Sequence, residues 1–491
     1  MTSWRDAIGR AAHDRRVLGV LLLAWVAIAA RELTWSSLFH ADQRLIDFRV
    51  FWCGGQVALQ GANPYLFEPL RTCEHQYGAG LFSVSRNFVM PFVLPPFDIA
   101  PFAQLARMAY GTAAWFFTGV SAVALLAGIV LVARSTGAPL VLAASALLVS
   151  VGLPSLWLGQ LVPLELLFLS AAAYALARRR DAVAGACAVL SLLEPHVGAF
   201  VVVSVALLVP RARAVLAGGL ALLASLTVRD ANVAPLGLYL ATLAEHTRAE
   251  AGSYGQYSLT FVLRYLHAPL DFAVAAGAAS SLVLLVAAVV LARALDARGM
   301  RAAIVYIPTA CAVFGGTFVH LTQIALAVPA ALLVHACARN TLARRLAGLA
   351  AIVLSAPWPI AASNKQTLAA ALFAVAVTTW YTTGRRYRGT LAAVALTWLA
   401  LVPLQNTADV VPPIPTVAVA APSSLASTAW KDALDQMTVD SPRSFWLKVP
   451  TWIALCALLG AALVVMRREP LTPRPPPWRP PESPRPAAVA P

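Results

Sequence analysis

The chain has 491 residues, of which 59% are hydrophobic and only 12% are charged, and its mean hydropathy is +0.72. Soluble domains average about 45–50% apolar and about 25% charged residues, so this composition excludes an ordinary water-soluble fold and favours a polytopic membrane protein. The formal net charge of +15 comes from 37 Lys and Arg against 22 Asp and Glu. Most of the excess lies in short arginine clusters between apolar runs. This pattern is typical of cytoplasmic loops and does not indicate a nucleic-acid-binding face.

The first apolar run, 17–30, follows a basic segment and resembles a signal peptide in outline. It has no small-residue cleavage site and is followed by Arg31 and Glu32. We therefore expect a retained first membrane span. A long polar loop, about 31–110, comes next, and prolines interrupt its later apolar part. Such a segment favours helices that lie along the membrane surface over a straight span.

The remaining apolar runs predict further membrane helices, which gives an all-α integral membrane protein of about fourteen spans. With the N-terminus inside, the arginine clusters all fall on the cytoplasmic side. Three larger loops then fall outside, at about 31–110, 229–270 and 405–449, and both termini are inside. The predicted spans after the first are 111–133, 138–153, 162–178, 182–194, 196–209, 213–228, 271–293, 302–318, 320–337, 346–360, 366–383, 388–404 and 450–466.

Three parts of the chain are expected to differ in organisation. Residues 1–404 form one transmembrane module with two outer loops. Residues 405–469 add the third outer loop and the last span. Residues 470–491 are proline-rich and polar, which predicts an extended, largely disordered cytoplasmic tail.

The six cysteines are scattered. Four of them lie in or beside apolar runs, where cysteine usually packs as a small hydrophobic residue. Cys53 and Cys73 share the first outer loop. They form a disulfide if that loop faces an oxidising compartment, and otherwise both remain free thiols. No CxxC spacing and no His/Cys cluster is found, so no metal is expected.

Asp47 is the first candidate for chemistry. It follows the first span in an aromatic stretch that includes Phe48 and Trp52, with Arg49 two residues further on. A partly shielded carboxylate at a membrane interface is well placed to take a proton from a hydroxyl. The structural alternative is that Asp47 caps a short helix or pairs with Arg49.

A second group of polar residues lies at the predicted outer ends of spans. Gln160 ends one span, and Glu165 falls a few residues into the next. Glu194, Pro195 and His196 lie at an outer apex, where proline breaks the helix and leaves backbone groups that need partners. These side chains either contact a ligand or only satisfy the local structure.

The second outer loop carries Gln256, Ser258 and Arg264, and His320 lies at the outer edge of a later span. Arg264 is outside against the charge bias, which favours a phosphate partner. The alternative for this aromatic-rich loop is an interfacial belt. His320 would hydrogen-bond either a phosphate oxygen or a nearby backbone carbonyl.

Several short motifs follow one another in order: Asp47-x-x-Val50-Phe51, Gly54-Gly55, Gly61-x-Asn63-Pro64-Tyr65, Pro95-Pro96, Leu158-Gly159-Gln160, Gln256-x-Ser258 with Arg264, and His320 with Pro329. Together they resemble glycosyltransferase family 87, whose GT-C membrane enzymes include polyprenol-phosphate-mannose-dependent α-(1→2)-mannosyltransferases. The likeness runs from about Arg31 to Ala331. It rests on the order of the motifs and on their placement on one membrane side, since no single motif is specific.

The resemblance implies a GT-C helix bundle whose first periplasmic loop carries the catalytic aspartate, here Asp47. It implies inverting transfer of a sugar, with mannose favoured, from a polyprenyl phosphate to a glycolipid or cell-envelope glycan. No cofactor and no nucleic-acid partner are expected, metal dependence stays open, and the active site is expected to face outward from the plasma membrane. Asp47 would deprotonate the acceptor hydroxyl, while Arg264 and His320 would stabilise the leaving phosphate. The other substrate-binding positions are Arg49, Gln160, Glu194, His196, Gln256 and Ser258.

Two positions depart from the family pattern. Glu194-Pro195 stands where members commonly show Lys-Pro, and Tyr257 stands in a motif that usually begins Asn-Gln-Ser. The sugar therefore stays open between mannose, arabinose and glucose. A transporter or lipid flippase, and a non-catalytic GT-C-like scaffold, are the alternatives. The gathering of polar candidates on one predicted face favours the transferase over the transporter.

Overall fold

The structure is a computed structural model, and it describes residues 45–77, 89–253, 255–363, 365–384, 386–404, 421, 423–436 and 445–471, with Arg16, Gly19, Val20, Leu23 and Ala27. All regular structure in these residues is helical, apart from two isolated antiparallel bridges, Leu66–Leu425 and Gln256–His320. The all-helical prediction is thereby confirmed. Most of the expected first span and nearly all of the expected disordered tail lie outside the described residues.

Five helical segments of the described chain are long and apolar enough to cross a membrane. They are α5 (Tyr110–Thr136), the run Leu140–Leu158 made of α6 (Leu140–Leu147), η4 (Leu148–Gly152) and α7 (Leu153–Leu158), the run Pro210–Arg229 that contains α11 (Arg213–Arg229), α14 (Leu270–Asp296) and α23 (Val449–Arg468). Shorter helices follow most of the other predicted ranges. The total of about fourteen spans stays a prediction.

The shorter apolar helices are α8 (Val162–Ala177), α9 with η5 (Asp181–Leu193), α10 (Pro195–Leu208), α15 (Ala303–Ala312), η7 with α16 (Ile324–Cys337) and α20 (Tyr387–Leu401). The remaining helices used below are α2 (Ile46–Leu59), α3 (Phe67–Tyr77), α4 (Ile99–Leu105), α12 (Leu236–Glu250), α13 (Leu259–Tyr265), α17 (Thr341–Leu354), α19 (Lys365–Thr382) and α21 (Ala426–Gln436).

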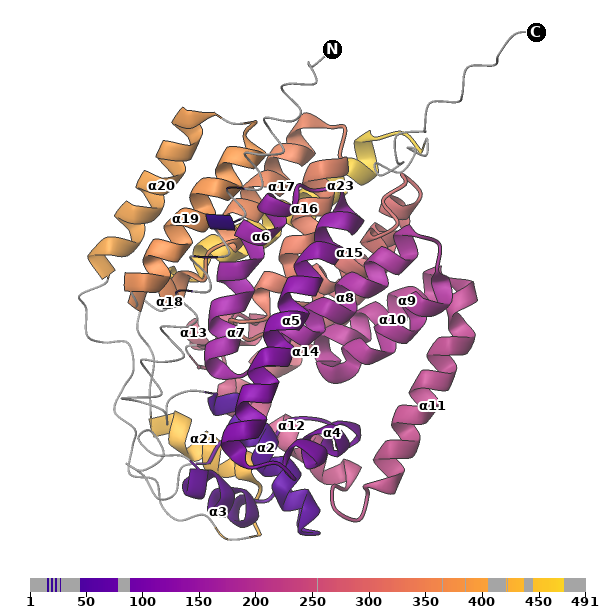
Figure 1. Cartoon of the computed structure of the whole chain (residues 1–491), viewed down its shortest axis with the longest axis vertical. Coiled ribbons are helices and arrows are strands. Elements are labelled where there is room, and N and C mark those ends of the chain that lie inside the picture. The colour runs from indigo at the N-terminus through magenta and orange to yellow at the C-terminus, as the bar shows by residue number, and fades with distance from the viewer. Residues whose placement is uncertain are drawn as a thin grey trace.

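These helices form two layers (Figure 1). The larger layer is a bundle in which α5 packs on α8, α17 on α23, and α14 on α15. Below it in the view lies a smaller group, α2, α3, α4, α12 and α21, which we call the cap layer. In the cap layer, α21 packs on both α12 and α3, so a segment from near the C-terminal end of the chain contacts one from its beginning.

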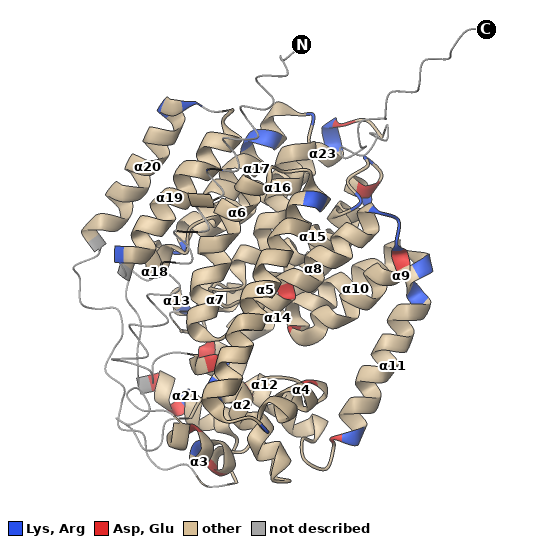
Figure 2. Cartoon of the chain, viewed as in Figure 1, with Lys and Arg blue, Asp and Glu red and all other residues tan. Residues whose placement is uncertain are grey.

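Charged residues are sparse along the middle of the bundle and gather near helix ends (Figure 2). Arg178, Arg179 and Arg180 follow the end of α8, and Arg467 and Arg468 end α23. Charge at the ends of apolar helices is what a bilayer requires, because its hydrocarbon core offers no hydration. The arrangement is that of a membrane protein, as the composition predicted.

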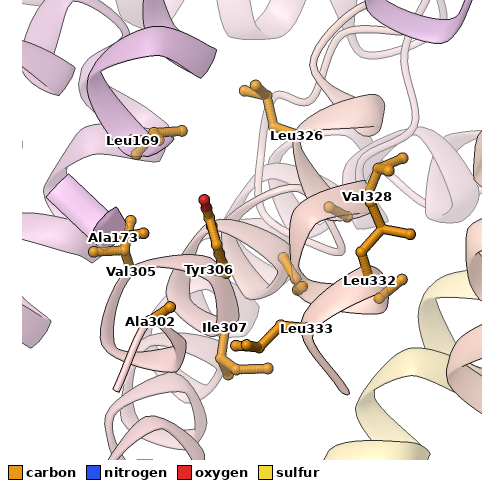
Figure 3. Packing of buried hydrophobic residues seen from close by; sticks show 14 of the residues in the cluster. Leu169, Ala173, Ala302, Val305, Tyr306, Ile307, Leu326, Val328, Leu332 and Leu333 are labelled. Carbon is orange, nitrogen blue, oxygen red and sulfur yellow. The ribbon is translucent and has the colours of Figure 1, made fainter. Parts of the chain in front are cut away.

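The short helix α15 is the centre of the bundle, and every one of its residues is buried. In Figure 3, Val305, Tyr306 and Ile307 of this helix lie among Leu169 of α8 and Leu333 of α16. The hydroxyl of Tyr306 lies 2.7 Å from the Ser135 hydroxyl, so the polar group in this apolar core has a partner. In lipid, such close packing holds helices together better than apolar burial alone.

The chain leaves α15 early, after ten residues that rise about 15 Å, although the sequence predicts a span over 302–318. The reason is a non-helical stretch, 313–323, in which Gly316 has φ +91°. Its backbone needs partners from outside. The Gly316 N–H donates to Ser280 Oγ (2.9 Å), and the Val319 carbonyl accepts from the Tyr257 N–H (2.8 Å). This pairing holds the His320 loop against the loop that precedes α13.

Candidate active site

The first turn of α2 rests against the end of α7, and a glycine permits the contact. Gly159 has φ +76°, and a Cβ there would lie 2.7 Å from the Cβ of Phe48. The Leu45 N–H at the start of α2 donates to a carbonyl of α7 at 2.9 Å. The Leu-Gly-Gln motif therefore does two things: its glycine admits α2, and its glutamine, Gln160, comes to lie beside Asp47.

The Gly-Gly motif lets α2 pack closely on the segment around α4. A Cβ on Gly54 would lie 2.2 Å from the ring of Phe92, and one on Gly55 would lie 2.3 Å from the Phe102 carbonyl oxygen. Neither contact is possible for a larger residue without a shift of the backbone or the ring. The motif positions α2 and does not itself contact the candidate site.

Cys53 of α2 and Cys73 of α3 form a disulfide, with their Cα atoms 5.7 Å apart. Of the two outcomes left open by the sequence, the structure has the bonded one. The other four cysteines are free. The disulfide joins α3 to the helix that carries Asp47, so it restrains the cap layer.

The Asp47 carboxylate is surrounded by polar groups from three other elements. Burial raises the pKa of Asp47, and the raised value is opposed first by the charge of His320 and then by a hydrogen bond with the Gln160 side chain. Glu250 raises the pKa further by repulsion. Asp47 thus shares one electrostatic environment with His320, Gln160 and Glu250, which lie far from it in the chain.

Arg49 is 1% exposed and is the weakest of the charges acting on Asp47. It also acts on Glu74, whose pKa burial raises to about 8 while the Met90 N–H and Arg49 oppose the rise. Arg49 therefore places a buried positive charge in the first turn of α2, within the cap layer. This position suits a structural cation better than a contact to substrate.

The loop that carries Gln256 pairs with the loop that carries His320. The two residues form an isolated bridge, and Gln256 Oε1 accepts from the Val319 N–H at 3.0 Å. A Cβ on Gly255 would lie 2.8 Å from His320 Nε2, so glycine leaves room for the imidazole. The Gln256 side chain thereby fixes the backbone beside His320.

Glu194 is held by Gln323, which also holds the His320 loop. Gln323 Nε2 donates to Glu194 Oε2 at 3.0 Å, and Gln323 Oε1 accepts from the His320 N–H at 2.8 Å. His196 Nδ1 lies 3.8 Å from Glu194 Oε2. Burial raises the pKa of Glu194 to about 7, with the Gln323 hydrogen bond opposing and Asp47 adding repulsion. Glu194 therefore titrates near neutral pH beside Asp47.

Some residues near Asp47 and His320 were not among the predicted site residues. His246 and Glu250 lie one turn apart on α12, and Trp430 of α21 donates from Nε1 to Glu250 Oε1 at 2.7 Å. The Phe318 ring centroid lies 5.1 Å from that of His246 and 5.8 Å from that of His196. The i,i+4 spacing of His246 and Glu250 on a helix is the sequence signal that would have found them.

We call this set the Asp47 cluster: Asp47, Gln160, Glu194, His196, His246, Glu250, Gln256, Phe318, His320, Thr322 and Gln323. Five of its buried polar atoms have no hydrogen-bond partner in the described part of the chain: His196 Nε2, His246 Nδ1, Glu250 Oε2, Gln256 Nε2 and His320 Nδ1. A buried polar atom without a partner costs about 1–3 kcal/mol. Several in one cluster indicate a binding site for a polar ligand.

Comparison with known families gives one finding. Residues 92–322 match the family model of glycosyltransferase family 87. The match supports this family, as the order of the motifs indicated, and implies a membrane glycosyltransferase. Comparison with curated proteins and with solved structures gives no match. The family 87 match contains the Asp47 cluster except Asp47 itself and Gln323.

Two of the residues that the family 87 resemblance singles out lie apart from the cluster. The Arg264 Nη1 donates to the Ala268 carbonyl at 2.6 Å, beyond the end of α13. The Ser258 hydroxyl accepts from the Phe261 N–H at 3.2 Å and so caps the start of that helix. Within the described residues, both side chains hold α13 in place and make no hydrogen bond to the cluster.

The Asn-Pro-Tyr motif also has a structural part. Asn63 Oδ1 accepts from the Tyr65 N–H at 2.9 Å, and the buried Tyr65 hydroxyl donates to the Leu94 carbonyl at 3.0 Å. These contacts fix the chain ahead of the Pro95-Pro96 segment.

Glu165 is fully buried in α8, and neither carboxylate oxygen has a hydrogen-bond partner among the residues described.

A surface pocket of about 540 Å³ lies between α2 and α3, on the side of the disulfide. None of its lining residues belongs to the Asp47 cluster. No group of three or more His, Cys, Asp or Glu in the described residues is arranged to hold a metal ion.

Proposed function

We propose that the protein transfers a sugar, with mannose favoured, from a polyprenyl-phosphate donor to a lipid-linked or cell-envelope glycan acceptor, with inversion. The site faces the extracytoplasmic side of the plasma membrane. Asp47 is the general base. The observation that carries the proposal is the position of this carboxylate beside Gln160 and His320. The cluster around it has five buried polar atoms without a hydrogen-bond partner in the described residues.

The reaction uses the carboxylate as a proton acceptor. Asp47 takes the proton of the acceptor hydroxyl, the hydroxyl oxygen bonds to the anomeric carbon, and the bond from that carbon to the phosphate oxygen breaks. The polyprenyl phosphate leaves with the electron pair, and Asp47 ends protonated. Burial raises the pKa of Asp47, which makes the ionised carboxylate a stronger base toward a hydroxyl.

The other groups of the cluster suit binding and charge stabilisation. His320 would donate to a phosphate oxygen as its charge grows in the transition state. The amides of Gln160 and Gln256 match sugar hydroxyls, since each amide both donates and accepts. Glu194 and His196, which stand side by side at the break between two helices, would contact further hydroxyls of the sugar.

The disulfide supports the proposed orientation. Cys53 and Cys73 lie in the same two helices that hold Asp47 in the cap layer. Disulfides persist in oxidising compartments and are rare in the cytosol. The arginine-rich ends of α8 and α23 favour the opposite, cytoplasmic side.

A transporter or flippase is the second candidate, and Glu165 is the observation that favours it, because an acid buried in an apolar helix is common in proton-coupled transport. Against it, the polar groups of the Asp47 cluster gather at loops and helix ends. That placement favours a one-sided active site.

One experiment separates the two candidates. Purified protein in liposomes is given radiolabelled polyprenyl-phosphate mannose, arabinose or glucose together with a glycolipid extract as acceptor. The transferase predicts a new labelled glycolipid and free polyprenyl phosphate. Movement of the labelled donor between leaflets, with no new glycolipid from any of the three donors, would overturn the proposal.

A further inference from the structure

Lys448 is an unusual residue for its place in the fold. It precedes α23 as its N-cap and is 0% exposed, which is rare for lysine. Its ammonium lies 3.3 Å from the centroid of the Phe261 ring and 5.5 Å from that of Tyr257. The segment 445–448 thus brings a cation onto the second outer loop.

That position connects Lys448 to the Asp47 cluster in two ways. Tyr257, under the ammonium, follows Gln256 directly and accepts at its carbonyl from Trp452 Nε1 of α23 at 3.0 Å. Glu250 acts electrostatically on Lys448, and the same carboxylate acts on Asp47. Glu250 therefore stands within electrostatic reach of both the candidate base and the buried lysine.

A phosphate donor needs such a cation. The carboxylates of the cluster, Asp47, Glu194 and Glu250, repel a phosphate, while the departing polyprenyl phosphate gains negative charge. Arg264 is engaged with the Ala268 carbonyl. The start of α23, a helix of 20 residues, adds the positive end of its dipole next to Lys448.

We propose that Lys448 binds the phosphate of the polyprenyl-phosphate donor, so that a segment outside the family match completes the donor site. The inference rests on the proposed function and adds the residue that recognises the leaving group. Glu250 is the acid that acts electrostatically on Lys448, and the donor phosphate adds a second anion to its surroundings. Burial lowers the pKa of Lys448 well below its usual value, with Glu250 opposing, and a phosphate nearby favours the charged form further.

The alternative role is a latch, in which the cation–π contact with Phe261 only fastens the segment 445–448 to α13. The two roles differ in what they predict for lipid binding. A latch changes the stability of the protein, and a phosphate contact changes the preference for a phosphorylated lipid over the same lipid without phosphate.

The test measures binding of undecaprenyl phosphate and of undecaprenol to the full-length protein in detergent. We expect the wild type to prefer the phosphate. Lys448→Met keeps the apolar stem over Phe261, and it should reduce that preference by about 10-fold or more while leaving undecaprenol binding unchanged. Lys448→Arg should keep most of the preference, because the charge remains. Lys431→Met, in the partly exposed Lys431–Asp435 pair of α21, is the matched control and should change nothing.

Several results would overturn the inference. One is a Lys448→Met protein with a shifted unfolding temperature but the wild-type preference for phosphate, which would establish the latch. If Lys448→Met does not fold, Lys448→Gln is measured instead, and a Gln variant that keeps the wild-type preference would have the same force. Sugar transfer is measured in parallel. If the wild-type protein transfers sugar and Lys448→Met keeps its phosphate preference, only this inference is contradicted. If the wild-type protein is inactive with every donor, the proposed function is contradicted.

Discussion

The segment that matches the glycosyltransferase family and the parts of the chain on either side of it contribute different chemistry to the candidate site. Residues 92–322 supply amides, imidazoles and two glutamates, among them Gln160, His246 and His320. The candidate base, Asp47, comes before this segment, and the buried Lys448 comes after it. Most groups suited to holding a sugar, and His320, which is proposed to donate to the phosphate, lie within the match, whereas the proposed base and the proposed phosphate-binding lysine come from outside.

The two flanking regions are attached to the matched segment by different means. The preceding region is held to the matched segment by the contact at Gly159, and the Cys53–Cys73 disulfide joins two of its own helices. The following region is held to the matched segment by the hydrogen bond from Trp430 to Glu250, and the Leu66–Leu425 bridge joins it to the preceding region. A site assembled in this way should be sensitive to changes in both flanks, and Asp47→Asn, loss of the disulfide and Gly159→Ala probe the preceding one.

The largest effect is expected from Asp47→Asn. The amide has nearly the shape of the carboxylate but cannot accept the proton, so transfer should fall by about 10²–10⁴-fold. Undecaprenyl phosphate should still bind. The control is Asp435→Asn, at an exposed position of α21, which should leave the rate unchanged. A rate for Asp47→Asn close to that of the wild type would remove the base from the proposal.

Removal of the disulfide should mainly affect stability. The two cysteines are separated by 20 residues, and replacing both by alanine should reduce the free energy of unfolding by about 3 kcal/mol. Thermal unfolding with and without reductant measures the loss. Cys456→Ala, at a free cysteine, serves as the control. If neither the mutation nor the reductant changes the unfolding temperature, the bond does not restrain the cap layer.

Gly159→Ala tests the contact between α2 and α7. The substitution combines a strained φ of +76° with a Cβ only 2.7 Å from Phe48, so we expect a loss of about 2 kcal/mol and weaker transfer. Gly61→Ala is the matched control, because its φ of +74° is similar but its Cβ would meet open space. If both variants lose equal stability and keep full activity, the contact does not position Asp47.

Glu194→Gln should produce the smallest change, visible only through pH. The pKa of Glu194 is raised to about 7 in the folded protein, so the folded state holds a proton that the unfolded chain releases near its ordinary value. The stability of the wild type should therefore fall as pH rises from about 4.5 through about 7. Glu194→Gln should fall less over this window when unfolding is followed at several pH values. A variant that follows the wild-type curve would show that Glu194 does not titrate there.

The sequence predicted the helices well where apolar length decides them. The range 111–133 corresponds to α5 (Tyr110–Thr136), and 271–293 corresponds to α14 (Leu270–Asp296). The range 302–318 was too long, because hydropathy does not register that the backbone near Gly316 pairs with other segments. Hydropathy therefore predicts where helices form, and tertiary hydrogen bonds decide where some of them stop.

The candidate site was predictable in part. Asp47, Gln160, Glu194, His196, Gln256 and His320 lie together, while Arg264 and Ser258 hold α13. His246, Glu250 and Lys448 were not predicted, because their positions depend on how α12 and α23 pack. A lysine beside an outer loop, against the charge bias, was the available signal for Lys448.

The most direct test of the central claim is a cryo-electron microscopy structure of the full-length protein with undecaprenyl phosphate bound. We predict a phosphate within about 4 Å of the Lys448 ammonium and facing His320, with the Asp47 carboxylate exposed to the same space. A phosphate bound in the pocket between α2 and α3, or at the arginine-rich helix ends, would contradict the account.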